Sequence, residues 1–106
     1  MVDRLALLQD LKHYLKQGYS DSIHDIVLFG SRAKGTSNEY SDYDILIVLD
    51  NDYTAQDENL IYDLCYDIDL KYNIVIDAHL ISTRELHTIR GKQPIISTAL
   101  KTGIYA

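Results

Sequence analysis

The segment Gly30–Asp44, GSRAKGTSNEYSDYD, decides how the rest of the chain is interpreted. It lies between two short apolar runs, residues 26–29 and 45–49. Because both runs are unbroken and rich in branched side chains, each predicts a buried strand rather than a helix. Asp42 and Asp44 stand two residues apart at the start of the second strand, so their carboxylates project to the same side. Two like charges held this close repel each other unless a cation or a proton lies between them, and we expect a divalent metal ion there.

The end of the first strand has the residue types that suit a phosphate group. Gly30 would permit positive φ and a close backbone approach, and the Ser31 hydroxyl could hydrogen-bond a phosphate oxygen. A short helical turn over residues 31–34 would turn its free N–H groups toward that phosphate. Arg32 and Lys34 either meet a triphosphate electrostatically or are simply solvated, and Ser41 would cap or support the aspartate loop.

Two other glycine-loop motifs are excluded. Gly30 and Gly35 have the spacing of a Walker A loop, but Thr36 stands where that motif needs its lysine. A dinucleotide-binding fingerprint needs a glycine where this chain has Arg32. Both motifs therefore lack a residue that their chemistry requires.

The length and charge of the chain narrow the classes of function. A length of 106 residues predicts a single domain, 1–106. The formal net charge of the chain is −6. Because nucleic-acid affinity rests on Lys and Arg, this charge argues against a nucleic-acid partner. No apolar run is long enough to span a membrane, and the first residues do not resemble a signal peptide. The single cysteine, Cys65, fits a packing role in a reducing cytoplasm.

Hydrophobic periodicity predicts an α/β (α+β) fold in which helices pack on a small mixed sheet. A capping box at Ser82–Glu85 and a proline at Pro94 mark the starts of the last two helices. The predicted strands are residues 25–29, 42–49 and 73–81, and the predicted helices are residues 3–17, 31–34, 55–71, 82–90 and 94–103. The acidic side of the 55–71 helix is interpreted as a solvated face.

Asp77 is the only acid in the third apolar run, and a lone acid there is costly to bury unless it is paired or bound to a metal. The alternative is that Asp77 lies at a solvated edge of the sheet. Asp67 and Asp69 are alternative acids, although they belong to a predicted helix. His79 shares a strand face with Asp77. Since histidine is not a usual magnesium ligand, a structural or acceptor-side role is expected for it.

The pattern G-S-x3-G-x5-S-D-x-D resembles the signature of the nucleotidyltransferase superfamily whose fold is shared with DNA polymerase β. Within that superfamily the chain is most similar to the minimal nucleotidyltransferases. The resemblance implies that Asp42, Asp44 and Asp77 are catalytic and ligate two Mg2+ ions. It also implies nucleotide binding at Gly30, Ser31, Arg32, Lys34 and Ser41. The implied reaction transfers AMP from ATP to an acceptor hydroxyl and releases pyrophosphate.

The same resemblance implies a partner. Minimal nucleotidyltransferases are often antitoxins paired with an all-helical HEPN-type RNase toxin, and the antitoxin can transfer AMP onto a tyrosine of its toxin. Two alternatives stay open from the sequence. The chain could neutralise a toxin by binding and occlusion without catalysis, or it could modify a small molecule such as an antibiotic after completing its site by dimerisation.

Overall fold

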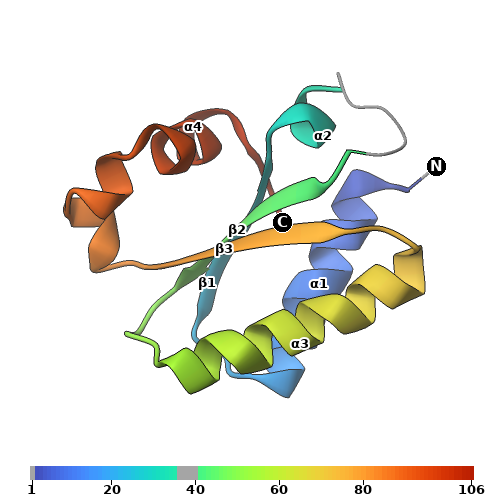
Figure 1. Cartoon of the computed structure of the whole chain (residues 1–106), viewed down its shortest axis with the longest axis horizontal. Helices are drawn as coiled ribbons and strands as arrows, with labels where there is room; N and C mark the ends of the chain where they lie inside the picture. The colour runs from blue at the N-terminus through green and yellow to red at the C-terminus, as the bar shows by residue number, and fades with distance from the viewer. Residues whose placement is uncertain (1, 36–40) are drawn as a thin grey trace.

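The protein is described by a computed structural model in which residues 2–35 and 41–106 are placed. Within these residues four strands form one mixed sheet in the order β3-β2-β1-β4 (Figure 1). Strand β1 (Ile23–Phe29) is antiparallel to both β2 (Tyr43–Leu49) and β4 (Ile104–Tyr105), and β2 is parallel to β3 (Ile76–Ser82). The predicted fold class, helices packed on a small mixed sheet, is confirmed.

Helices cover both faces of the sheet. On one face lie α1 (Arg4–Gly18) and α3 (Ala55–Tyr72), and on the other lies α4 (Pro94–Thr102) (Figure 1). The short helix α2 (Ser31–Lys34) follows β1 directly. The helix starts are specified locally, because the Asp3 carboxylate accepts bonds from the first turn of α1, and Thr54 forms a capping box with Asp57 at α3.

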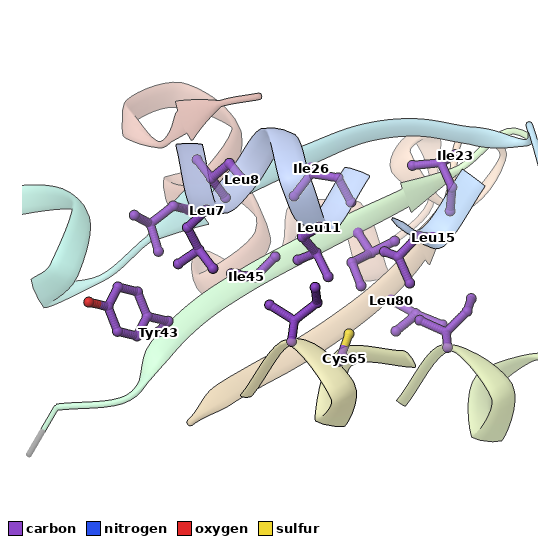
Figure 2. Close-up of a cluster of buried hydrophobic side chains, with 14 of the residues drawn as sticks. Leu7, Leu8, Leu11, Leu15, Ile23, Ile26, Tyr43, Ile45, Cys65 and Leu80 are labelled. Carbon is purple, nitrogen blue, oxygen red and sulfur yellow. The ribbon is translucent and has the colours of Figure 1, made fainter. Parts of the chain in front are cut away.

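The central position of β2, which is covered on both faces, explains why the sequence of this strand is apolar without interruption. Ile45 and Ile47 enter a core cluster with α1 and α3, whereas Leu46 and Val48 enter a second cluster beneath α4. Figure 2 shows the first cluster, in which side chains of α1, Cys65 of α3 and Ile45 of β2 converge. Burying each such aliphatic side chain contributes about 1.5–3 kcal/mol, so β2 is held from both faces. This agrees with the central position predicted for it.

Polar contacts also join α1 to α3. The Tyr14 hydroxyl donates to Asp67 at 2.6 Å, and Asp10 accepts from Lys71 at 2.7 Å and from Tyr72 at 2.9 Å. The prediction of a purely solvated acidic face on α3 was therefore wrong in part, because periodicity shows which side of a helix is polar but not which of its acids meet a neighbouring helix.

Three side chains bond main-chain groups of β3, which lies at one end of the strand order. The Asp69 carboxylate accepts from the Ile76 N–H at 3.0 Å, and Tyr53 and Arg90 donate to the Leu80 carbonyl at 3.2 and 2.6 Å. Side chains that occupy the main-chain groups of an edge strand discourage pairing with another chain.

Several element boundaries differ from the predictions. The strand β4 was not predicted, because two residues are too few for a periodic pattern. Strand β3 begins at Ile76 rather than at residue 73, because Asn73 adopts φ 54° and ends α3 in the left-handed conformation. Strands β1 and β2 begin at Ile23 and Tyr43 rather than at residues 25 and 42.

The single helix predicted over residues 82–90 was wrong. The capping box does form between Ser82 and Glu85, but two 3-10 turns follow it, η1 (Glu85–His87) and η2 (Arg90–Lys92). Thr88 has extended backbone between them, and its hydroxyl donates to the Glu85 carbonyl at 2.7 Å. A side chain that occupies a helix carbonyl competes with helix continuation.

None of the helices in the described ranges combines the length and the apolar character needed to cross a membrane.

Gly103 lets α4 turn tightly into β4, and its replacement tests that packing. A Cβ at this position would overlap the Val27 side chain and the Ala99 carbonyl and lie 2.9 Å from the Leu28 carbonyl. Because these are mostly rigid main-chain atoms, Gly103→Ala is expected to lower the free energy of unfolding by about 1–3 kcal/mol in urea denaturation. Lys101→Ala, an exposed change on α4, should alter it by less than about 0.5 kcal/mol. Equal stability of the two variants would contradict the packing described.

Candidate active site

Asp44 and Asp77 are direct neighbours across the parallel pair of strands β2 and β3. Asp44 is also paired with Phe29, the last residue of β1, so the two acids lie where β1 ends and where β2 and β3 begin. Alternation along each strand places Asp44 on the face of Leu46, and Asp77 on the face of Ile81. This is the face opposite α1 and α3. The two carboxylates therefore lie beside the segment that carries Gly30 and Ser31.

His79 joins this pair of acids. One ligand atom from each of Asp44, Asp77 and His79 lies within 4.8 Å of the other two. The Nε2 atom of His79 is 3.4 Å from Oδ2 of Asp77, and its ring packs at a tilt against Phe29, with 5.6 Å between ring centroids. Nε2 is buried and has no hydrogen-bond partner among the described residues. The sequence had indicated the shared face, but His79 was not among the predicted site residues.

Electrostatics make the metal-free pair unfavourable. Partial burial raises the pKa of the Asp44 carboxyl, and the charge of Asp77 beside it raises the pKa further. His79 acts in the opposite direction, and the more distant Asp42 adds to the increase. One half-exposed and one exposed carboxylate, with an imidazole nitrogen that makes no hydrogen bond to the described residues, are a donor set that fits a divalent cation.

Asp42 is not part of this three-residue cluster. It is exposed, immediately before β2, and its charge raises the pKa of both Asp44 and Asp69. The alternative third acids lie elsewhere: Asp67 is bonded to Tyr14, and Asp69 is bonded to the Ile76 N–H. Of the acids considered, Asp77 is the one that β3 places beside Asp44.

Gly30 leaves room for the Asp44 carboxylate. Its φ of 75° lies in the region that favours glycine, and a Cβ built on it would overlap Oδ2 of Asp44. Ser31 is the first residue of α2 and is half-buried, whereas Lys34 is exposed. Gly35 ends α2 with φ 75°, and a Cβ there would meet no atom within 4 Å. The loop predicted for residues 36–40 lies outside the described residues.

Arg32 has a role that the sequence did not indicate. Its guanidinium donates to the Ser41 carbonyl from Nε at 3.1 Å and from Nη2 at 3.0 Å, and it lies 4.5 Å from the centre of the Tyr43 ring. Arg4 of α1 in turn donates to the carbonyls of Arg32 and Ala33 at 3.0 and 2.9 Å. Arg32 thus connects α2 to the start of β2, a third possibility beside phosphate contact and solvation. Only long-range contacts, which no local motif encodes, show this.

The geometry agrees with the comparison to protein families. The protein-family model described as "Nucleotidyltransferase domain" matches residues 8–105 of this chain. The chain belongs to the nucleotidyltransferase domain family.

Two proteins from Methanocaldococcus jannaschii are similar in sequence to this chain and support its assignment to the family. Each is named a "putative protein adenylyltransferase". The first is 40% identical over 79 residues, which cover 74% of this chain and 73% of the relative. The second is 30% identical over 92 residues, covering 85% of this chain and 62% of the relative. The chain therefore spans less than two thirds of the second relative's length.

Two crystal structures have the same fold. One is a toxin–antitoxin MntA–HpeT variant with two aspartate-to-glutamate substitutions two positions apart; it aligns with TM-score 0.63 and 16% identity over 92% of this chain and 69% of that chain. The other is a toxin–antitoxin with AMP-PNP, with TM-score 0.66 and 18% identity over 97% of this chain and 72% of that chain. At these identities the likeness shows the fold alone.

Gly30→Ala and Gly35→Ala together test the backbone conformation of Gly30 and its close approach to Asp44. Gly35, with φ 75° and ψ 14°, lies in the left-handed helical region, where an alanine should cost about 1–2 kcal/mol. Gly30, with φ 75° and ψ −156°, lies in a region that is essentially limited to glycine, so an alanine there should be more strained. In Gly30→Ala the methyl group must also displace the Asp44 carboxylate. Chemical denaturation should therefore show the larger loss of stability in Gly30→Ala, and a larger loss in Gly35→Ala would contradict the geometry.

The raised pKa of Asp44 predicts a pH dependence of stability. Because this pKa in the folded chain lies above the ordinary value of 3.8, the folded state binds the proton more tightly than the unfolded state. The contribution of Asp44 to stability is therefore full below pH 3.8 and is lost as pH rises through the folded-state pKa. In metal-free buffer, Asp44→Asn should melt at a higher temperature than the wild type at pH 7, and the difference should close toward pH 3.8.

Asp63→Asn, an exposed change on α3, is the control for this pH series. Its melting temperature should follow that of the wild type at every pH. Lower stability of Asp44→Asn at pH 7 would contradict the repulsion between Asp44 and Asp77.

Proposed function

We propose that this nucleotidyltransferase transfers AMP from ATP to a hydroxyl group of a partner protein and releases pyrophosphate, in a reaction that depends on two Mg2+ ions. The observation that carries the proposal is the pairing of Asp44 with Asp77 beside Gly30. A pair of acids with one raised pKa is costly to maintain, and such groups concentrate at functional sites.

Adenylyl transfer to a protein is supported by the names of similar proteins. The relatives from Methanocaldococcus jannaschii carry the name "putative protein adenylyltransferase", and one crystal structure of the same fold is of a toxin–antitoxin with AMP-PNP. The toxin–antitoxin structures support a partner of the toxin class, and we propose a helical HEPN-type toxin with an acceptor tyrosine. The proposed preference for adenine as the base rests on the same relatives' names and on the AMP-PNP structure.

In the proposed site, Asp42, Asp44 and Asp77 hold the metal ions through carboxylate oxygens. When bound, the ions would neutralise the triphosphate and stabilise the attacking and leaving oxygens. Gly30 keeps the space beside Asp44 open, and the Ser31 hydroxyl donates to a β- or γ-phosphate oxygen. Lys34, which is exposed at the end of α2, attracts the nucleotide by its charge. Arg32 acts through the Ser41 carbonyl, holding the main chain immediately before Asp42.

The transfer itself is a displacement at the α-phosphorus of ATP. The acceptor oxygen forms a bond to the α-phosphorus while the bond from that phosphorus to the bridging oxygen of the β-phosphate breaks. The electron pair of the broken bond leaves with pyrophosphate. Asp77, the more exposed acid of the pair, takes the proton of the acceptor hydroxyl. Positioning and charge stabilisation, rather than a covalent enzyme intermediate, then account for the rate.

We further propose that residues 1–106 act as one catalytic domain whose acceptor site is completed by a partner chain. We also propose that the protein works in the reducing cytoplasm, where a free thiol such as that of Cys65 persists. Cys65 is buried and free, and burial raises the pKa of its thiol to about 12, so that it is a packing residue and not a nucleophile.

Binding of a non-hydrolysable ATP analogue tests the proposed site directly. In calorimetry the wild type should bind the analogue in the presence of Mg2+, and a chelator should abolish the binding. Asp44→Asn and Asp77→Asn should each weaken it by at least about tenfold, because each removes a carboxylate from the metal ligands. Asp69→Asn is both control and competitor, since Asp69 was the alternative third acid, and it should bind like the wild type.

Four outcomes would redirect the proposal. Binding of the analogue that persists in the presence of the chelator would remove the metal-dependent mechanism. A loss of binding in Asp69→Asn without a loss in Asp77→Asn would reassign the third carboxylate. If Asp44→Asn still neutralises a partner toxin in cells, the protein acts by occlusion, and labelling of an antibiotic instead of a protein would favour a small-molecule acceptor.

A further inference from the structure

His79 lies inside the proposed metal site with one nitrogen unused. It faces the same side of β3 as Asp77, two residues away, and packs on Phe29 at the end of β1. Its Nε2 atom is buried and lies 3.4 Å from Oδ2 of Asp77, and a ring nitrogen of His79 lies within 4.8 Å of a carboxylate oxygen of Asp44 and of Asp77. Neither the carboxylate chemistry of the proposed reaction nor the packing of the core requires a nitrogen at this point.

We propose that His79 is a metal ligand of this nucleotidyltransferase and that its imidazole makes the site prefer Mn2+ to Mg2+. The inference rests on the proposed function, because it concerns the same metal site. It adds a specificity-determining residue that the three aspartates do not include.

The orphaned nitrogen is the first reason. Burying a polar group without a hydrogen bond costs about 1–3 kcal/mol, and Nε2 has no hydrogen-bond partner among residues 2–35 and 41–106. An aliphatic side chain could pack on Phe29 at this position without that cost. The next two residues of β3, Leu80 and Ile81, are both buried and aliphatic. A cation between Nε2 and the carboxylates would supply the missing partner.

The second reason is that a contact with Asp77 does not explain the nitrogen. Nε2 is 3.4 Å from Oδ2 of Asp77, yet the two atoms do not form a hydrogen bond. Orientation of Asp77 by a hydrogen bond from His79 is therefore not the arrangement present. Elsewhere on the surface, His24 forms a close contact with Asp50 at 2.8 Å, which shows the difference between a paired imidazole and His79.

The third reason is the preference of the metal ions. Mg2+ binds almost entirely through oxygen and holds its water tightly. Mn2+ also accepts carboxylate oxygens, but imidazole nitrogen suits transition metals better than it suits Mg2+. A site with two carboxylates and one imidazole thus favours Mn2+, whereas three carboxylates alone would discriminate less between the two ions.

Pulsed electron paramagnetic resonance with Mn2+ alone, added to the full chain without nucleotide, tests the inference. The wild type should show the coupling of a directly bound imidazole 14N nucleus to Mn2+, and His79→Leu should lose it. In calorimetry the same variant should bind Mn2+ at least about tenfold more weakly. Its affinity for Mg2+ should change by less than about twofold, because Mg2+ makes little use of nitrogen ligands.

His24→Gln is the matched control, since it removes another imidazole that lies beside carboxylates. It should keep the nitrogen coupling and the Mn2+ affinity of the wild type. If His79→Leu does not fold, His79→Gln keeps a polar side chain of similar length and should lose the coupling in the same way.

The outcomes separate this inference from the proposed function. Mn2+ binding that requires Asp44 and Asp77 but shows no 14N coupling would overturn the role of His79 and leave the proposed reaction intact. Coupling that persists in both His79 variants would also overturn it. If the wild type binds neither Mn2+ nor the ATP analogue with Mg2+, both proposals fail together.

Discussion

The repulsion between Asp44 and Asp77 is the constraint to which the rest of the structure responds. Their positions on adjacent parallel strands hold the two carboxylates together, and partial burial of Asp44 removes some of the water that would screen them. A carboxyl group whose pKa is raised by folding lowers the stability of the fold at neutral pH. The protein can hold this arrangement because β2, which carries Asp44, is buried on both faces by aliphatic side chains.

One face of the sheet is used for packing alone, and the other face carries both packing and the candidate site. One face is sealed by α1 and α3, which are also joined to each other through Asp10 and Asp67. The other face carries α4 over part of its area and presents Asp44, Asp77 and His79 at the end where β1 leads into α2. Because side chains alternate along β2 and β3, the same strands contribute to the core and to the candidate site without a separate catalytic domain.

A chain of contacts positions the two segments that flank the site. Arg4 of α1 binds the carbonyls of α2, and Arg32 of α2 binds the Ser41 carbonyl and stacks on Tyr43. The first helix is thereby connected to the residue that precedes Asp42. The guanidinium group suits this position, since its planar array of donors can bond one carbonyl twice and lie over an aromatic ring at the same time.

Local sequence determined the fold class, the nucleotidyltransferase motif from Gly30 to Asp44, and the alternation that puts Asp77 and His79 on one face, because periodicity, caps and turn residues act over a few neighbouring positions. Only the tertiary structure decided the register of Asp44 with Asp77, which arises from pairing across 33 residues of chain. It alone decided that Arg32 bonds the Ser41 carbonyl, that Asp42 lies outside the compact cluster, and that Nε2 of His79 makes no hydrogen bond to the described residues. These are contacts between distant segments, and their geometry depends on how the sheet and helices pack together.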